Sequence, residues 1–484
     1  MTDFNKPTSR RELLANAALG IGGLALGGAF FPSAASASDA AAGGLVDPLA
    51  PKATHFPAKV KSVIWLHMDG APSTLDLFDY KPELIKLAGQ EVPASFMKGI
   101  KEGVRGTSNK LLATKREWKQ YGESGSWFSD FLPNLATQAD KIAWIKSSTT
   151  IGATHDISIL KLNTGDLSPG RPSLGAWVQY ALGAANPDLP AYVVLYNDKR
   201  EPRGGAINWS SGFLPAVYQG TAFRPGDSPI LHLNRPELVA EGEQGSTLGL
   251  LNRLNRSHAR HHPNDTELQA RIRSYDLAAR MEVTAPEAVS LAKESEATKA
   301  LYGIDDESSK SYGETLLRAR RLVERGVRFI QVVSGELEIE GEGKNWDGHN
   351  NIESNHRAHT RMVDKPIAGL LADLESRGLL ESTLVVWTSE FGRTPFGQSG
   401  NGRDHNPWGY TQWMAGGGVK AGTTIGGTDE IGMQAVGKKV DTYDLHATVL
   451  QLMGLDHLKT TFLHNGRSER PTVVYGEVVK ELLA

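Results

Sequence analysis

Short apolar runs alternate with longer amphipathic stretches through much of this 484-residue chain. Apolar runs of strand length stand at 62–68, 142–145, 191–195, 328–333 and 384–388. Between the last two runs, apolar residues at positions 367, 370, 371 and 374 recur at the spacing of one helix face, and Gly378 follows. Strands that alternate with helices pair in parallel through right-handed crossovers. We therefore predict an α/β fold with a mostly parallel central sheet flanked by helices.

Other segments extend this picture. Further helices are predicted at 174–182, across 265–325 and at 444–454, and a helix followed by a strand at 127–146. Residues 200–262 lack regular periodicity and are rich in glycine, proline and asparagine. We expect them to form a long irregular insertion, a lid or wall over a site, within a single domain that spans 61–484.

The N-terminal residues have a different character. Arg10 and Arg11 precede an apolar run rich in glycine and alanine, 15–31, and Ala-Ser-Ala at 35–37 offers a small-residue cleavage site. This order is typical of a twin-arginine (Tat) export signal; the alternative is a membrane anchor, for which the run is short. We predict that residues 1–37 are removed on export by the Tat machinery and that 38–60 form an extended linker. The mature chain is then periplasmic or extracellular, without a membrane span.

Composition excludes several classes of function. The formal net charge is −3, and no basic stripe is interleaved with aromatic residues, so we expect no nucleic-acid partner. The chain has no cysteine, which rules out disulfides, thiolate metal sites and cysteine nucleophiles.

Acidic residues and histidines stand where predicted strands end. Asp69 and Glu390 follow the first and last of these strands, and Asp347 and His349 come after the strand at 328–333. Ligands of α/β sheets bind beyond the carboxyl ends of strands. Mixed carboxylate and imidazole ligands suit zinc, manganese or iron better than calcium or magnesium. With His405, which lies in a polar loop, these residues predict a divalent-metal site.

Each of these residues also has a simpler interpretation. Asp69 and Glu390 are equally placed to be turn residues that cap a following element. Thr154 and His155 head a predicted helix that ends at Gly165, where they either line the site or simply cap the helix. His356 and His359 are expected to lie on a solvated helix face.

Five segments together resemble the domain-of-unknown-function 1501 family of exported bacterial proteins, within the alkaline phosphatase superfamily. They are 67–79, 346–349, 390–394, 402–405 and 444–448, and the resemblance covers nearly all of the mature chain. It implies an alkaline-phosphatase-like fold. It also implies a divalent metal held by Asp69, by Asp347 with His349, by Glu390 and by His405.

Two features depart from the superfamily pattern. The late-strand pair is Glu390-Phe391, so one histidine ligand is missing. The resemblance places His155 where the superfamily has its nucleophile, with Thr154 beside it. His155 thus remains open as a ligand, a nucleophile or a general base, and Thr154 as a hydroxyl nucleophile.

Two function classes follow. The first is a metal-dependent hydrolase of sulfate or phosphate esters, in which Arg393 or Arg403 binds the oxygens of a small anionic substrate. The second is a catalytically inactive binding or scaffold protein of the cell envelope that retains the fold. The retained acids and histidines favour the first class, and the missing histidine favours the second.

Overall fold

The computed structural model describes residues 47–100, 109–198, 200–226, 229–230, 241–262, 265–339, 344–397 and 400–484. The predicted export signal at 1–37 and the first part of the predicted linker lie outside the described residues. None of the helices in the described ranges combines the length and apolar character that a membrane crossing needs.

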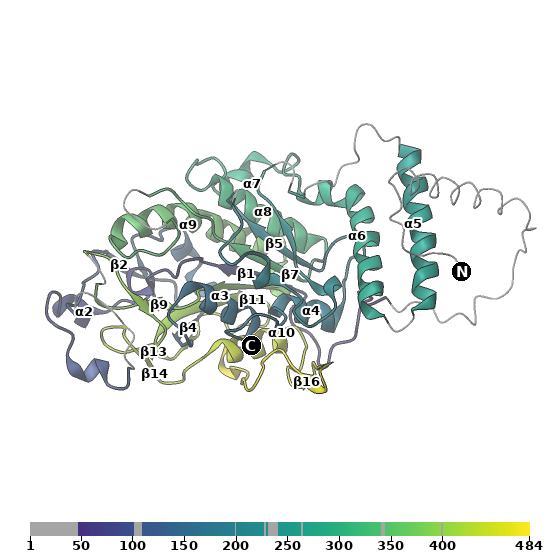
Figure 1. Ribbon diagram of the computed structural model, residues 1–484. Coiled ribbons are helices and arrows are strands. Elements are labelled where there is room, and N and C mark those ends of the chain that lie inside the picture. Colours follow the sequence, from purple (N-terminus) through teal and green to yellow (C-terminus); the bar gives the residue numbers. More distant parts are fainter. Residues whose placement is uncertain are drawn as a thin grey trace, which may run out of the picture. The chain divides into compact units, whose positions relative to one another are not determined.

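An eight-stranded sheet has the strand order β12-β4-β11-β8-β1-β7-β5-β6. Its strands run through the centre of the fold (Figure 1). Its strands are β1 (Ser62–His67), β4 (Ile142–Ser148), β5 (Tyr192–Tyr196), β6 (Thr221–Phe223), β7 (Phe329–Val333), β8 (Thr383–Thr388), β11 (Tyr410–Gly416) and β12 (Thr424–Ile425). Strand β11 runs antiparallel to β4 and β8, and the other neighbouring pairs are parallel. The predicted mostly parallel sheet is confirmed. Strand β1 lies between β7 and β8, so the residues that follow these three strands meet at one edge.

Helices cover both faces of the sheet (Figure 1). Val63 and Trp65 of β1 pack in one core with α3 (His155–Thr164), α4 (Leu174–Leu182) and α10 (Thr442–Leu452). Ile64 and Leu66 point the other way and pack in a second core with α8 (Lys310–Glu324) and α9 (Ile352–Ser376). Because both faces are buried, the central strands are mostly apolar and do not alternate regularly with polar residues, although β7 carries the buried Gln331.

Two segments differ from the sequence expectation. The helix expected after residue 127 is a 3₁₀ helix, η3 (Leu135–Lys141), which follows the hairpin of β2 (Trp118–Tyr121) and β3 (Ser126–Ser129). Residues 241–261, expected to be irregular, form the helix α5 (Glu241–His261), which packs on α6 (Thr266–Val289). The glycines at 242, 245 and 249 hide the helical periodicity of α5 in the sequence.

Smaller elements complete the described part of the chain. The helical ones are η1 (Thr74–Asp76), α2 (Pro82–Lys86), η2 (Ala94–Met97), η4 (Gly205–Trp209), η5 (Ala216–Tyr218), α7 (Glu296–Leu301), η6 (Leu380–Ser382) and η7 (Lys480–Leu482). The strands are β9 (Gly392–Arg393), β10 (His405–Asn406), β13 (Gly427–Thr428), β14 (Ala435–Val436), β15 (Phe462–His464) and β16 (Arg467–Glu469).

Candidate functional site

Three histidines and an aspartate converge in one group: His155, Asp347, His349 and His405, with one ligand atom of each within 4.8 Å of the others. The Nε2 atoms of His155, His349 and His405 lie 3.1, 2.8 and 3.2 Å from the same atom, Asp347 Oδ1. A tetrahedral ion with bonds of about 2.0–2.1 Å separates its ligand atoms by about 3.3 Å. The spacing of the group therefore fits one small divalent cation.

The fold brings this group together from three places in the chain. His155 opens α3, Asp347 and His349 stand between β7 and α9, and His405 lies on β10, which pairs with β9. The backbone N–H of Trp346 donates to the Asp69 carbonyl at 3.0 Å and so ties the Asp347 loop to the end of β1. Gly70 permits this approach, since it has a φ of +100° and a Cβ there would lie 2.7 Å from the nitrogen of Trp346.

Hydrogen bonds to the outer ring nitrogens turn two imidazoles toward Asp347. His405 Nδ1 lies 2.6 Å from the carbonyl of Ala153, which accepts only, so Nδ1 carries the proton. His155 Nδ1 lies 2.7 Å from Glu390 Oε1, which also accepts from the Gly70 N–H at 3.0 Å. Metal-ligating histidines usually hold their outer N–H on a carboxylate or a carbonyl in this way.

Charges around Asp347 Oδ1 favour a carboxylate there. Burial raises the pKa of Asp347, but the Arg393 guanidinium at 2.6 Å and the hydrogen bonds with the three histidines outweigh burial and lower it strongly. Burial, followed by the Arg393 charge, lowers the pKa of His405. A neutral His405 with its proton on Nδ1 presents an Nε2 lone pair to a carboxylate oxygen, and a bound cation would relieve that contact.

His155 is held between two carboxylates. Burial disfavours its charged form, but hydrogen bonds with Asp347 and Glu390 and the charges of both acids raise its pKa. Burial likewise opposes ionisation of Glu390, yet the hydrogen bond from His155 and the charge of His67 lower the pKa of Glu390. Glu390 therefore acts through His155, as an outer carboxylate.

Asp69 lies outside the four-residue group. Its carboxylate is buried, accepts from Asn345 Nδ2 at 3.3 Å, and has its pKa raised by burial and then by the charge of Glu390. Asp69 and His67 line a small cavity of about 10 Å³, together with Asn163 and Gln331. This is room for about one water molecule. The structure thus brings Asp69 close to Glu390 without placing it among the converging atoms.

Both predicted anion-binding arginines are buried and engaged in internal bonds. Arg393 donates to the carbonyls of Gly70 and Ala71 in addition to Asp347. Arg403 forms an ion pair with Asp76 at 2.7 Å, and this charge lowers the pKa of Asp76 although burial opposes the shift. Arg403 therefore does not contact the four-residue group. Arg393 contacts it through its ion pair with Asp347.

Thr154 occupies the N-cap position of α3, is exposed, and makes no side-chain capping bond to the helix. The simple capping interpretation is thus not what the structure shows. The first turn of the helix presents its N–H groups next to His155, and such a helix end favours an anion.

The prediction that His356 and His359 lie on a solvated helix face is wrong, because both side chains are buried on α9. The Ser73 N–H donates to His356 Nε2 at 2.7 Å, and Trp346 contacts both rings at centroid distances of 5.1 and 5.0 Å. These histidines hold the segment that precedes Asp347.

Phe391 stands where the superfamily pattern has a histidine ligand, and the structure gives it another role. Its buried ring lies 4.9 Å from the His155 ring and 4.5 Å from the His405 ring, measured between centroids. Phe391 therefore forms an apolar support under two of the converging imidazoles, and its position beside Glu390 was the signal in the sequence.

Replacing Glu390 with glutamine is expected to lower metal affinity about 10–100-fold, because the outer partner of a ligating histidine loses its charge. Metal affinity is measured by competition with a chromophoric chelator. The matched control is Glu381→Gln, an exposed acid just before β8, which should bind metal as the wild type does. Equal affinity in Glu390→Gln and wild type would contradict the role assigned to Glu390.

Stability is expected to fall as the pH drops below about 6.5, the ordinary histidine pKa in an unfolded chain. Burial lowers the pKa of His356 and His359 to about 3 and that of His446 to about 4. The unfolded chain therefore binds more protons below that pH, at a cost of about 1.4 kcal/mol per pH unit for each histidine.

His446→Gln tests this linkage, because glutamine keeps a donor for the Leu162 carbonyl that His446 Nε2 contacts at 2.8 Å. Between pH 7 and 5 the variant should lose about 2 kcal/mol less stability in urea unfolding than the wild type. The exposed control His262→Gln should lose as much as the wild type. If His446→Gln loses as much stability between pH 7 and 5 as the wild type, the linkage to His446 is wrong.

Comparison with known families decides the affiliation of the chain. Residues 60–483 match the family described as "Protein of unknown function (DUF1501)". The chain belongs to this family. No curated protein matches it.

Several solved structures align with this chain at low similarity. The PsFucS1 sulfatase from Pseudoalteromonas sp. is 15% identical with a TM-score of 0.35, and the alignment covers 81% of this chain and 68% of that one. The alkaline phosphatase from the Antarctic bacterium TAB5 is 14% identical with a TM-score of 0.36, over 81% and 98% of the two chains. The lipoteichoic acid synthase LtaP from Listeria monocytogenes is 9% identical with a TM-score of 0.31, over 84% and 76%. At such scores these likenesses carry no conclusion about activity.

Proposed function

We propose that this DUF1501 protein is an exported metal-dependent hydrolase of sulfate or phosphate esters. The observation that carries the proposal is the convergence of three imidazole nitrogens on Asp347 Oδ1 at 2.8–3.2 Å. Mixed imidazole and carboxylate ligands select zinc, manganese or iron over calcium or magnesium. A divalent cation held there supplies Lewis-acid polarisation of an ester oxygen.

Residues of the chain fit the remaining requirements of such a site. His155, His349 and His405 would hold the cation with Asp347, while Glu390 and the Ala153 carbonyl orient two of the rings. The open first turn of α3 would bind the anionic oxygens of the ester through its N–H groups. The exposed Thr154 hydroxyl at that helix end is our candidate nucleophile.

One observation favours the second candidate, a binding protein without turnover. Arg393 Nη2 already places a positive charge 2.6 Å from Asp347 Oδ1. That guanidinium competes with a metal cation for the same oxygen. The four residues and Arg393 can therefore form a structural ion-pair cluster without a metal.

The test measures metal content by mass spectrometry on protein purified after native export, together with turnover of nitrophenyl sulfate and nitrophenyl phosphate. We expect about one metal ion per chain and turnover of at least one ester. Thr154→Ala should lower the turnover rate at unchanged metal content. Protein with metal but no turnover, or folded protein that takes up no zinc, manganese or iron, would exclude the hydrolase and support the binding protein.

Export is part of the proposal and has its own test. Replacing Arg10 and Arg11 with lysine should leave the precursor in the cytoplasm, because the twin arginines are what the Tat machinery recognises. Unchanged export of this variant would remove the Tat interpretation.

A further inference from the structure

Helix α5 receives little packing from the rest of the protein. Ala259 is the one buried position among the α5 side chains that the structure describes. The helix packs chiefly against α6, which lies between it and the sheet domain (Figure 1). A groove of about 1130 Å³ runs beneath it, lined by Leu248, Asn255 and Met281 among others. In proteins, most helical stability comes from packing of an apolar face against a neighbour. Helix α5 leaves apolar side chains without such packing, and a partner could cover them.

Those apolar groups gather on one side. Leu250, Leu251 and Leu254 are 48–55% exposed, and Tyr275 on the neighbouring α6 is 66% exposed; Leu251 and Tyr275 stand at the edge of the strip, since both also line the groove. Single exposed leucines are ordinary, but the spacing i, i+1, i+4 places these three on adjoining parts of one helix surface. Their arrangement makes an apolar strip.

A basic row lies beside this strip. Arg253, Arg256 and Arg260 follow one another at i, i+3 and i+7, and all three are exposed. Helix α5 has acids only at its start, Glu241 and Glu243, and residues 244–262 contain no aspartate or glutamate, although the whole chain has a net charge of −3. The outer side of α5 is therefore a local concentration of positive charge next to exposed leucines.

We propose that α5 docks this protein onto an anionic lipid surface, with the leucine strip at the boundary of the acyl chains and the arginine row against the phosphates. A helix with leucines on one side and arginines on the polar side lies in the plane of a membrane interface. Charge complementarity favours anionic lipid over a second copy of the chain, because a second copy would bring the same arginine row against itself. This surface is separate from the metal-site residues and does not depend on the proposed activity.

The cysteine-free sequence allows a local test in the full chain. Leu254→Cys is labelled with a polarity-sensitive nitrobenzoxadiazole dye and mixed with vesicles of phosphatidylcholine alone or with about one third phosphatidylglycerol. We expect the dye emission to rise several-fold and shift to the blue with the anionic vesicles only, and the rise to vanish at about 0.5 M NaCl. The matched control is Leu463→Cys on β15, which is 72% exposed and should not respond.

A second test removes the charges of the arginine row. Arg253→Gln/Arg256→Gln/Arg260→Gln in the labelled chain should weaken vesicle binding roughly 100-fold. The single control Arg467→Gln, with a side chain 65% exposed, should bind within about twofold of wild type. No response at position 254, an equal response at position 463, or wild-type binding by the triple variant would overturn the proposal. A response to the polyanion heparin but not to vesicles would also overturn it and assign α5 to an acidic polymer.

Discussion

Asp347→Asn is expected to abolish metal binding, with a loss of affinity of more than about 100-fold, since loss of an outer partner alone costs 10–100-fold. The change keeps the size of the side chain and removes the charge on which three imidazoles and Arg393 converge. It also leaves Arg393 without its carboxylate in a buried place, so some loss of stability accompanies the loss of metal. Metal content and chelator competition measure the first effect, and urea unfolding measures the second.

Asp404→Asn is the matched control. Asp404 is buried directly before His405, and its Oδ1 accepts from the His405 N–H at 2.8 Å, a hydrogen bond that the asparagine oxygen can also accept. This variant loses the same charge but should keep the metal content of the wild type. If Asp347→Asn keeps full metal occupancy while it remains folded, the four-residue group is not the ligand set.

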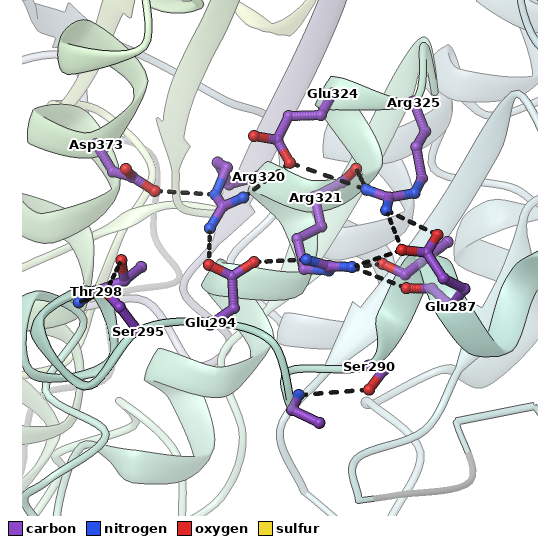
Figure 2. Close-up of polar contacts among 12 residues, drawn as sticks. Glu287, Ser290, Glu294, Ser295, Thr298, Arg320, Arg321, Glu324, Arg325 and Asp373 are labelled. Carbon is purple, nitrogen blue, oxygen red and sulfur yellow. Dashed lines mark hydrogen bonds and ion pairs between the residues drawn. The ribbon is translucent and has the colours of Figure 1, made fainter.

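Glu294→Gln is expected to destabilise the protein by about 3 kcal/mol, the largest stability effect we predict for a single charge. Glu294 lies between α6 and α7, is 8% exposed, and pairs with both Arg320 and Arg321 at 2.6 Å (Figure 2). Burial opposes its ionisation, but the hydrogen bonds from these arginines lower its pKa. Glutamine leaves two buried guanidinium groups short of a negative charge.

The expected loss of stability is near the low end of the range for a broken buried ion pair. Arg320 keeps its contacts with Glu324 at 2.8 Å and with Asp373 at 2.9 Å. Glu296→Gln is the control, since its side chain is 89% exposed and its pair with Lys299 at 2.8 Å is worth at most about 0.5 kcal/mol. Equal unfolding midpoints for the two variants would show that the network in Figure 2 contributes no more than surface pairs do.

The candidate site shows how far sequence reasoning reaches. Residue type and position identify three members of the group as ligand candidates: Asp347 and His349, which follow a strand, and His405, which lies in a polar stretch of sequence. The sequence leaves the role of His155 open, because the resemblance places it where the superfamily has its nucleophile. Only the positions of Asp347 and Glu390 show that its Nε2 atom faces the group. Sequence gave no means to see that Arg393 and Arg403 are buried, since an arginine in a loop is exposed in most proteins.

The sequence by itself determined five of the eight strands of the central sheet and several of its helices, because apolar periodicity follows directly from which side chains must leave water. It also determined that an acid or a histidine follows several strands. Only the tertiary structure decided that β1 lies between β7 and β8, which of the acids converge, and that His356 and His359 are buried. Those facts depend on contacts between residues hundreds of positions apart, such as Gly70 with Glu390. A local pattern of apolar and polar residues cannot predict such contacts.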